Sequence, residues 1–237
     1  MIDNLPTYIS LLFSFCTLAT LFLLVRVIRA SDTLKIRKIA GKITFILVFW
    51  LCLQVILSLV GIYSMDTRSI PPKILLYGIL PTIVIITMTF VSQKGREFMD
   101  SLSLEMLLYI HLIRIPVELA LYLLSLYELV PRLITFSGSN LDILAGLTVP
   151  LMVYLNTSKR KYLRALNLFW NIISLGLLLN VVILAFLSAP SPLQRISFEQ
   201  PNIAMLHFPF SWLPTFIVPI IIFVHLLSIR RLLLRKP

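Results

Sequence analysis

Seven long apolar runs, separated by short polar connections, constrain the fold of this chain more than any other feature of its sequence. They cover residues 8–27, 43–63, 74–91, 104–126, 141–155, 166–187 and 213–232. All but the fifth have roughly the 18 to 25 residues that a helix needs to cross about 30 Å of hydrocarbon. Backbone amides in hydrocarbon need internal partners, so the runs predict helices and not an open sheet. The predicted fold is an all-α seven-transmembrane helix bundle, with residues 1–237 as a single domain.

The composition agrees with a membrane protein, because 59% of the residues are hydrophobic and only 13% are charged. The net charge of +11 does not indicate a nucleic-acid partner, since the basic residues cluster at the ends of the apolar runs. We expect the lipid bilayer to be the main partner, with anionic lipids at the basic connections and no nucleic acid.

The orientation follows from where the basic residues lie. Asp3 and no Lys or Arg precede the first run, so that run is not typical of a secretory signal, and we expect it to stay in the mature protein. With the N-terminus outside and the C-terminus in the cytoplasm, 16 basic residues are inside and 4 outside. The inner ones are Arg26, Arg29, Lys35, Arg37, Lys38, Lys42, Lys94, Arg96, Lys159, Arg160, Lys161, Arg164, Arg230, Arg231, Arg235 and Lys236. The outer ones are Arg68, Lys73, Arg132 and Arg195.

The fifth run is the weakest, because it is short and contains Asp142, Gly146 and Pro150. A re-entrant or interfacial segment is the alternative to a crossing. Without this crossing, the count of basic residues would become 9 inside and 11 outside. The positive-inside rule therefore favours seven crossings.

The fourth run carries His111, Arg114 and Glu118, whose spacing places them on one face of a helix. A charge at the bilayer centre costs at least about 2.5 to 3.5 kcal/mol, so this face is expected to point into the bundle. Two interpretations remain open. Arg114 and Glu118 neutralise each other in a structural clasp beside Pro116, or they form a ligand, ion or proton site.

Other polar residues extend the list of candidates. Asp142 is expected at the same depth in the membrane as Glu118. It could equally cap the N-terminus of the fifth helix, together with Asn140. The asparagines of the sixth run are typical of bonding between helices, and the last outer connection is rich in proline and is expected to form an ordered cap. The ligand-binding or proton-coupling candidates are His111, Arg114, Glu118, Asn140, Asp142, Asn171, Asn180, His207 and His225.

Few cofactors are indicated. His111 and His225 lie at similar depths, which permits a weak bis-histidine haem hypothesis, and Glu118, Asp142 and His207 are dispersed candidates for a metal site. The seventh run has no lysine, so retinal is excluded as a Schiff base there. The two cysteines, Cys16 and Cys52, are expected to be free thiols.

Three stretches, HLIRIPVEL in the fourth run, NLDILAGLTVP in the fifth and the late QPNIAMLHFPFSWLP, resemble a family of uncharacterised bacterial seven-helix integral inner-membrane proteins. The resemblance covers residues 105–237 best and implies a bacterial inner (cytoplasmic) membrane. It brings no activity, cofactor or catalytic residue.

The leading functional hypothesis is the binding or transport of a small molecule or ion with proton coupling, in which Arg114 holds an anionic group and Glu118 exchanges a proton. One alternative is a membrane-embedded enzyme in which Glu118, Asp142 and His207 converge at the outer mouth. Another is a sensor or assembly scaffold that binds partners through its basic loops, with a purely structural charged face.

Overall fold

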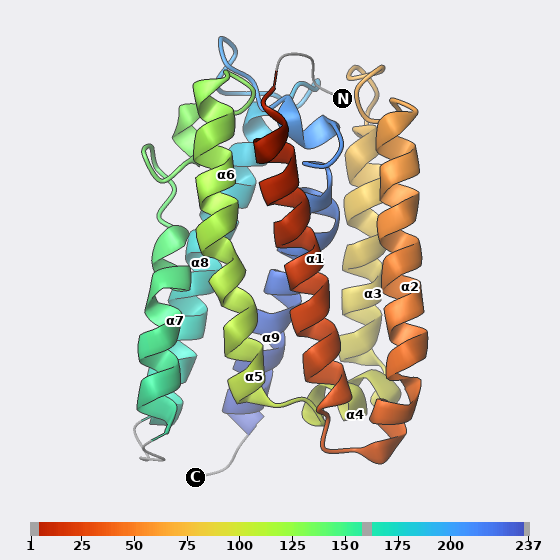
Figure 1. Ribbon diagram of the computed structural model, residues 1–237, viewed down its shortest axis with the longest axis vertical. Coiled ribbons are helices and arrows are strands. Elements are labelled where there is room, and N and C mark those ends of the chain that lie inside the picture. Colours follow the sequence, from red (N-terminus) through yellow and green to blue (C-terminus); the bar gives the residue numbers. More distant parts are fainter. Residues whose placement is uncertain (1–4, 158–162, 235–237) are drawn as a thin grey trace.

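The computed structural model describes residues 5–157 and 163–234, and its regular secondary structure there is entirely helical. The long helices run side by side along the longest axis of the molecule (Figure 1). The α-helices are α1 (Thr7–Arg29), α2 (Leu34–Leu59), α3 (Leu80–Val91), α4 (Gln93–Asp100), α5 (Leu104–Ile110), α6 (Arg114–Leu126), α7 (Ile143–Asn156), α8 (Leu163–Ser188) and α9 (Val218–Leu234). Five of the predicted inner basic residues lie outside the described part, namely Lys159, Arg160, Lys161, Arg235 and Lys236.

The expectation of a multi-pass helical membrane protein is confirmed. In the described residues, five helical stretches are long and apolar enough to span a bilayer. There are up to six if α3 and α4, which meet at an angle of 86°, are counted as one bent span. The helix α7 has 14 residues and is shorter than the others. Each predicted run corresponds to a helix. The second helix, however, begins at Leu34 and not at Ile43, because its basic residues continue the helix with their side chains exposed.

The fourth run forms one helical stretch from Leu104 to Leu126 that is interrupted near its centre. A short 3₁₀ turn, η2 (His111–Ile113), joins α5 to α6. Pro116 follows it and has no N–H to donate to the preceding turn, which accounts for the tightened geometry there. The interruption lies at the residues that carry the charged face.

Two prolines leave backbone carbonyls free, and α2 provides the donors for both. Pro219 in α9 cannot bond the carbonyl of Thr215, which accepts instead from Trp50 Nε1 at 2.9 Å. Pro81 in α3 likewise cannot donate to the carbonyl of Tyr77. That carbonyl accepts from Gln54 Nε2 at 3.4 Å. Thr215 belongs to the π-helix η5 (Leu213–Ile217) and Tyr77 to the π-helix η1 (Leu75–Ile79). These bonds attach α2 to two neighbouring helices.

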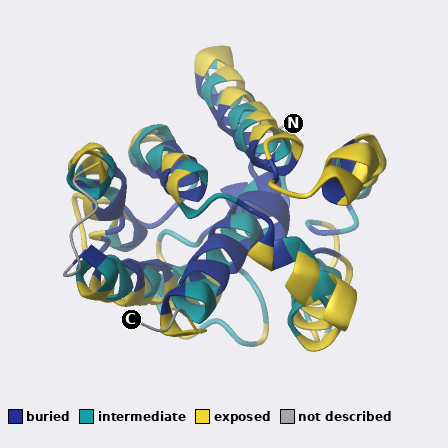
Figure 2. Cartoon of the chain, turned by 90° about the horizontal axis from the view of Figure 1, so that it is seen from below, coloured by how far each residue is buried: buried dark blue, intermediate teal, exposed yellow. Residues whose placement is uncertain are grey.

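Burial is concentrated on the inward faces, and exposed residues lie on the outer faces of the helices (Figure 2). The helix α8 packs along α9, whereas α1 packs against α2, α5 and α6. The exposed outer side chains are largely apolar, as lipid-facing residues must be.

The connection between α8 and η5 forms the ordered cap that the sequence predicts. Gln200 donates to the carbonyls of Ser125 and Val130 at 3.0 and 2.7 Å. The ring of Phe210 is buried and meets Phe13 of α1 edge to face at 5.2 Å. The cap therefore joins the N-terminal half of the bundle to its C-terminal half.

Candidate functional site

Arg114, the first residue of α6, is 1% exposed and lies at the centre of a polar network. Its Nε lies 3.4 Å from Asp142 Oδ2, and its two terminal nitrogens lie 3.4 and 3.3 Å from the carbonyl oxygen of Ser174 on α8. Its Nη2 also lies 2.9 Å from His225 Nε2 on α9. One buried side chain on α6 therefore connects the start of α7 with α8 and α9.

Asn140 connects the two carboxylates of the site. Its Nδ2 donates to Glu118 Oε1 at 2.7 Å and to the carbonyl of Ile134 at 2.9 Å, and its Oδ1 accepts from the backbone N–H of Asp142 at 2.8 Å. Asp142 occupies the N-cap position of α7, but its side chain makes no capping hydrogen bond. The cap hypothesis for the Asp142 carboxylate is therefore wrong, because that carboxylate pairs with Arg114.

Glycine makes this approach of α7 to α6 possible. A Cβ atom on Gly146 would lie 2.9 Å from Ile115 Cγ1 and 3.3 Å from both Arg114 Cβ and the carbonyl oxygen of His111. Any larger residue would push α7 away from the network. The absence of a side chain at Gly146 therefore helps to bring Asp142 within ion-pair distance of Arg114.

The two predicted histidines lie next to each other beside Arg114. The rings of His111 and His225 stack with centroids 4.1 Å apart, and Trp170 meets His111 edge to face at 5.3 Å. His225 Nδ1 lies 2.9 Å from Asn171 Oδ1. Two axial imidazoles must lie on opposite sides of a haem plane. The stacked rings leave no room for that plane, so the bis-histidine haem hypothesis is wrong.

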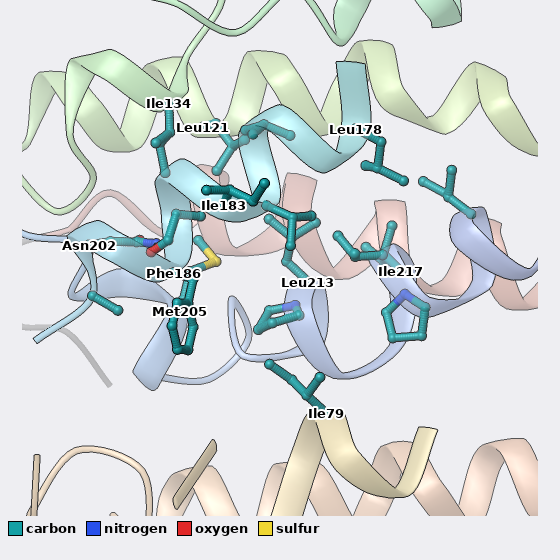
Figure 3. A pocket seen from close by; sticks show the side chains of 18 of the residues that line it. Ile79, Leu121, Ile134, Leu178, Ile183, Phe186, Asn202, Met205, Leu213 and Ile217 are labelled. Carbon is teal, nitrogen blue, oxygen red and sulfur yellow. The ribbon is translucent and has the colours of Figure 1, made fainter. Parts of the chain in front are cut away.

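A cavity of about 400 Å³ lies beside the charged residues, between α3, α6, α8 and the segment from η5 to α9. Figure 3 shows Ile79, Leu121, Leu178, Ile183 and Ile217 around it. Nearly all the wall is apolar. Its polar lining comes from Arg114, Glu118, Asp142 and Asn202.

Glu118 and Asp142 each keep one oxygen without a hydrogen-bond partner in the described part of the chain, Oε2 and Oδ1 respectively. Both side chains are buried, with 2% and 4% exposure. An unpaired buried acceptor is costly, so these oxygens suit a protonated carboxyl group, a hydrogen-bond donor or a cation. Arg114, in contrast, already contacts Asp142, Ser174 and His225, although its Nε has only the ion-pair contact and no hydrogen-bond partner among the described residues.

Two other candidates lie away from this cluster. Asn180 is exposed and donates to the carbonyl of Ser139 at 3.2 Å, which is a bond between segments and not part of the site. His207 follows the 3₁₀ turn η4 (Ala204–Leu206) in the cap and does not line the cavity. Partial burial lowers the pKa of the His207 imidazole. In residues 5–157 and 163–234, no group of three or more His, Cys, Asp or Glu could hold a metal ion, so Glu118, Asp142 and His207 do not converge.

Two features of the site are not evident from the sequence. The first is Trp170, which lies against both histidines and donates to Thr148 Oγ1 at 2.9 Å. The second is the apolar wall that α3 contributes to the cavity, because its residues do not differ from those of any other apolar run. The spacing of Trp170, Asn171 and Ser174 at i, i+1 and i+4 was the available signal, because it places three polar-edged residues near one side of α8.

One family model matches residues 71–233 and is described as Domain of unknown function (DUF8737). No curated protein and no solved structure matches the chain. The matched region includes α3 to α9 and therefore all the residues of the cavity and its polar network.

Proposed function

The chain belongs to the DUF8737 family, whose description assigns no activity, and we propose that it binds a small amphiphilic molecule inside the membrane. The observation that carries this proposal is the apolar cavity with two unpartnered carboxylate oxygens beside it. Pockets for small ligands typically combine apolar walls with a few placed polar groups.

The proposed setting is a single seven-helix domain in a bacterial inner membrane, with the N-terminus outside. The short helix α7 counts as a crossing because of the charge asymmetry, and its 14 residues extend over roughly 21 Å. Two amide hydrogen bonds between Asn156 and Asn167, at 3.1 and 2.7 Å, support this by holding its inner end to α8. Flanking residues and local thinning of the bilayer accommodate a span of this length.

The chemistry of the site favours a ligand that brings a cation or a hydrogen-bond donor. Arg114 is paired with Asp142 and bonded to Ser174 and His225, so it positions the carboxylate instead of holding an anionic group. Glu118 Oε2 and Asp142 Oδ1 remain as acceptors. An amine with an apolar body therefore complements both the walls and the polar edge of the cavity.

The proposal extends from binding to proton-coupled transport of the bound molecule. Asn140 fixes Oε1 of Glu118, and the other oxygen is available either for a proton or for the bound cation. The proton and the cation then compete for the same oxygen, and one replaces the other as the cavity opens first toward one side of the membrane and then toward the other. The stacked histidines lie on the inner side of Arg114 and extend a chain of titratable groups along the bundle.

Binding is tested with dansylcadaverine, a fluorescent primary amine with an apolar body, and purified protein. We expect saturable binding that unlabelled hexylamine reverses, and at least about a tenfold loss of affinity in Glu118→Gln, since a buried charged hydrogen bond is removed. Glu105→Gln, an exposed carboxylate at the start of α5, is the matched control. Equal affinity for the wild type and Glu118→Gln would exclude this site.

Transport is tested separately, in vesicles with an imposed pH gradient and a permanently charged trimethylammonium analogue of the probe. Such a probe crosses lipid slowly without a carrier. We expect gradient-driven uptake by the wild type and none by Glu118→Gln. Binding without uptake by the wild type would contradict the transport step and leave the binding proposal in place.

A further inference from the structure

A second cavity, of about 730 Å³, lies between α2 and α3 and is separate from the one at Glu118. We call it the α2–α3 groove. The helix α2 packs mainly on α1, whereas α3 packs on α4 and η1. The space between α2 and α3 is therefore bounded on its inner side by α9 and part of α1. Its walls are almost wholly apolar and include Ile39, Ile43 and Ile46 of α2, Ile85 and Ile86 of α3, and Phe223 of α9.

The groove has two different ends. Toward the middle of the bundle, the bonds from Trp50 to Thr215 and from Gln54 to Tyr77 attach α2 to its neighbours and close the space. At the other end Lys35 and Lys94 contribute to the lining. The α2 wall from Ile39 to Leu53 covers 14 residue steps, or about 21 Å. That length exceeds the about 15 Å of hydrocarbon in one leaflet.

The charged end is shaped by α4, which lies across the end of α3 at 86° (Figure 1). Lys35 and Lys94 form no ion pair with any residue that the structure describes. Glu97 also lines this end, and its Oε1 accepts from Gln93 Nε2 at 3.3 Å. The exposed Lys38 and Lys42 on α2 add positive charge nearby, so the net charge around the end favours an anion.

We infer that the α2–α3 groove is a binding site for an anionic glycerophospholipid, with an acyl chain between α2 and α3 and the phosphate at Lys35 and Lys94. The apolar length is sufficient for an acyl chain from one leaflet, and the unpaired ammonium groups lie where the head group of that lipid would be. The site does not depend on the function proposed for the cavity at Glu118. It differs from ordinary lipid contact in that its polar end selects the head group.

Trp50 provides a reporter inside the groove, because it is half-buried and lines the wall. The other two tryptophans, Trp170 and Trp212, are 9% and 8% exposed and are shielded from lipid. Brominated acyl chains quench tryptophan on contact. The full-length protein is reconstituted in phosphatidylcholine vesicles that contain a varied fraction of brominated phosphatidylglycerol, phosphatidylcholine or phosphatidylethanolamine.

We expect the wild type to bind brominated phosphatidylglycerol with a relative association constant at least about fivefold above that of brominated phosphatidylcholine. One basic side chain near an anionic head group contributes a preference of about this size. The variant Lys35→Gln/Lys94→Gln is expected to lose the preference. The variant Lys38→Gln/Lys42→Gln removes the same total charge from exposed positions of α2 outside the groove, and it is expected to keep the preference. All three proteins are compared at equal helix content by circular dichroism.

Three results would overturn the inference. One is an equal loss of preference in both double variants, which would indicate a diffuse surface attraction. Another is the absence of any preference in the wild type. The third is an equal or greater preference for brominated phosphatidylethanolamine, which would indicate that the Lys and Glu97 charges together select a zwitterionic head group.

Discussion

Arg114 forms its ion pair with Asp142, at the start of α7, and not with Glu118 on its own helix. The Nε of Arg114 lies 3.4 Å from Asp142 Oδ2, and both side chains are at most 5% exposed. The i, i+4 spacing of Arg114 and Glu118 had suggested that they neutralise each other. Because the charge is neutralised by another helix, Glu118 is left to bond Asn140 and to line the cavity.

The first prediction concerns this ion pair. Asp142→Asn is expected to lower the stability of the bundle by about 3 to 5 kcal/mol, because it leaves the buried Arg114 charge uncompensated. The double variant Arg114→Leu/Asp142→Leu is expected to lose less, since neither charge remains. The readout is thermal unfolding in detergent. The control Asp100→Asn breaks the ion pair with Arg230, in which Asp100 is 52% exposed, and should cost at most about 1 kcal/mol.

The second prediction concerns the close contact between α6 and α7. Gly146→Ala is expected to destabilise the protein by about 1 to 3 kcal/mol through overpacking against Ile115 and the backbone of His111. A Cβ on Gly176 of α8 would have no described atom within 4 Å, so Gly176→Ala is expected to be neutral or slightly stabilising. Equal unfolding temperatures for the two variants would refute the argument.

The third prediction concerns the carbonyls that the prolines leave free. Trp50→Phe removes the donor to Thr215, and Gln54→Leu removes the donor to Tyr77. Each is expected to cost about 1 to 3 kcal/mol, which is typical of leaving a buried acceptor unsatisfied. Wild-type stability in Gln54→Leu would show that neither this bond of 3.4 Å nor the hydrogen bond that Gln54 Oε1 accepts from the Tyr63 hydroxyl contributes to stability.

The fourth prediction concerns the orientation of α7. In a Cys52→Ala background, with Cys16 buried, single cysteines are placed at Ser139 and Thr157, which are exposed at opposite ends of α7. We expect a membrane-impermeant maleimide to label the cysteine at 139 in intact cells and the one at 157 only after permeabilisation. Labelling of both from outside would show that α7 does not cross.

The fifth prediction concerns the pH dependence of the connection between α2 and η1. Lys73 lies 3.1 Å from Asp66 Oδ2, and this hydrogen-bonded contact lowers the pKa of the Asp66 carboxyl below its ordinary value. The contact is therefore complete above the ordinary pKa of aspartate and is lost as the pH falls through the lowered value. Carboxyl carbon NMR should record this low midpoint. Lys73→Ala should raise the midpoint toward the ordinary value, whereas Lys94→Ala should leave it unchanged.

The positions of the helices were predictable because they depend on local sequence. The fourth run was predicted as residues 104–126 and is helical from Leu104 to Leu126. The first, third, sixth and seventh runs differ from their helical stretches by at most three residues at either end. Hydrocarbon requires each apolar run to satisfy its own backbone, so length and composition suffice to predict a helix. The inward face of His111, Arg114 and Glu118 also follows from the sequence, because charge avoids lipid.

The partners of those residues were decided only by the tertiary structure. Nothing in the sequence relates Arg114 to Asp142 or His225, because each contact depends on how far one helix is rotated and how closely it packs, as Gly146 permits. The cavity was equally unpredictable, since it is a volume that neighbouring helices leave unfilled. Periodicity determines which face of a helix is buried, but only the packing of several helices together determines what that face meets.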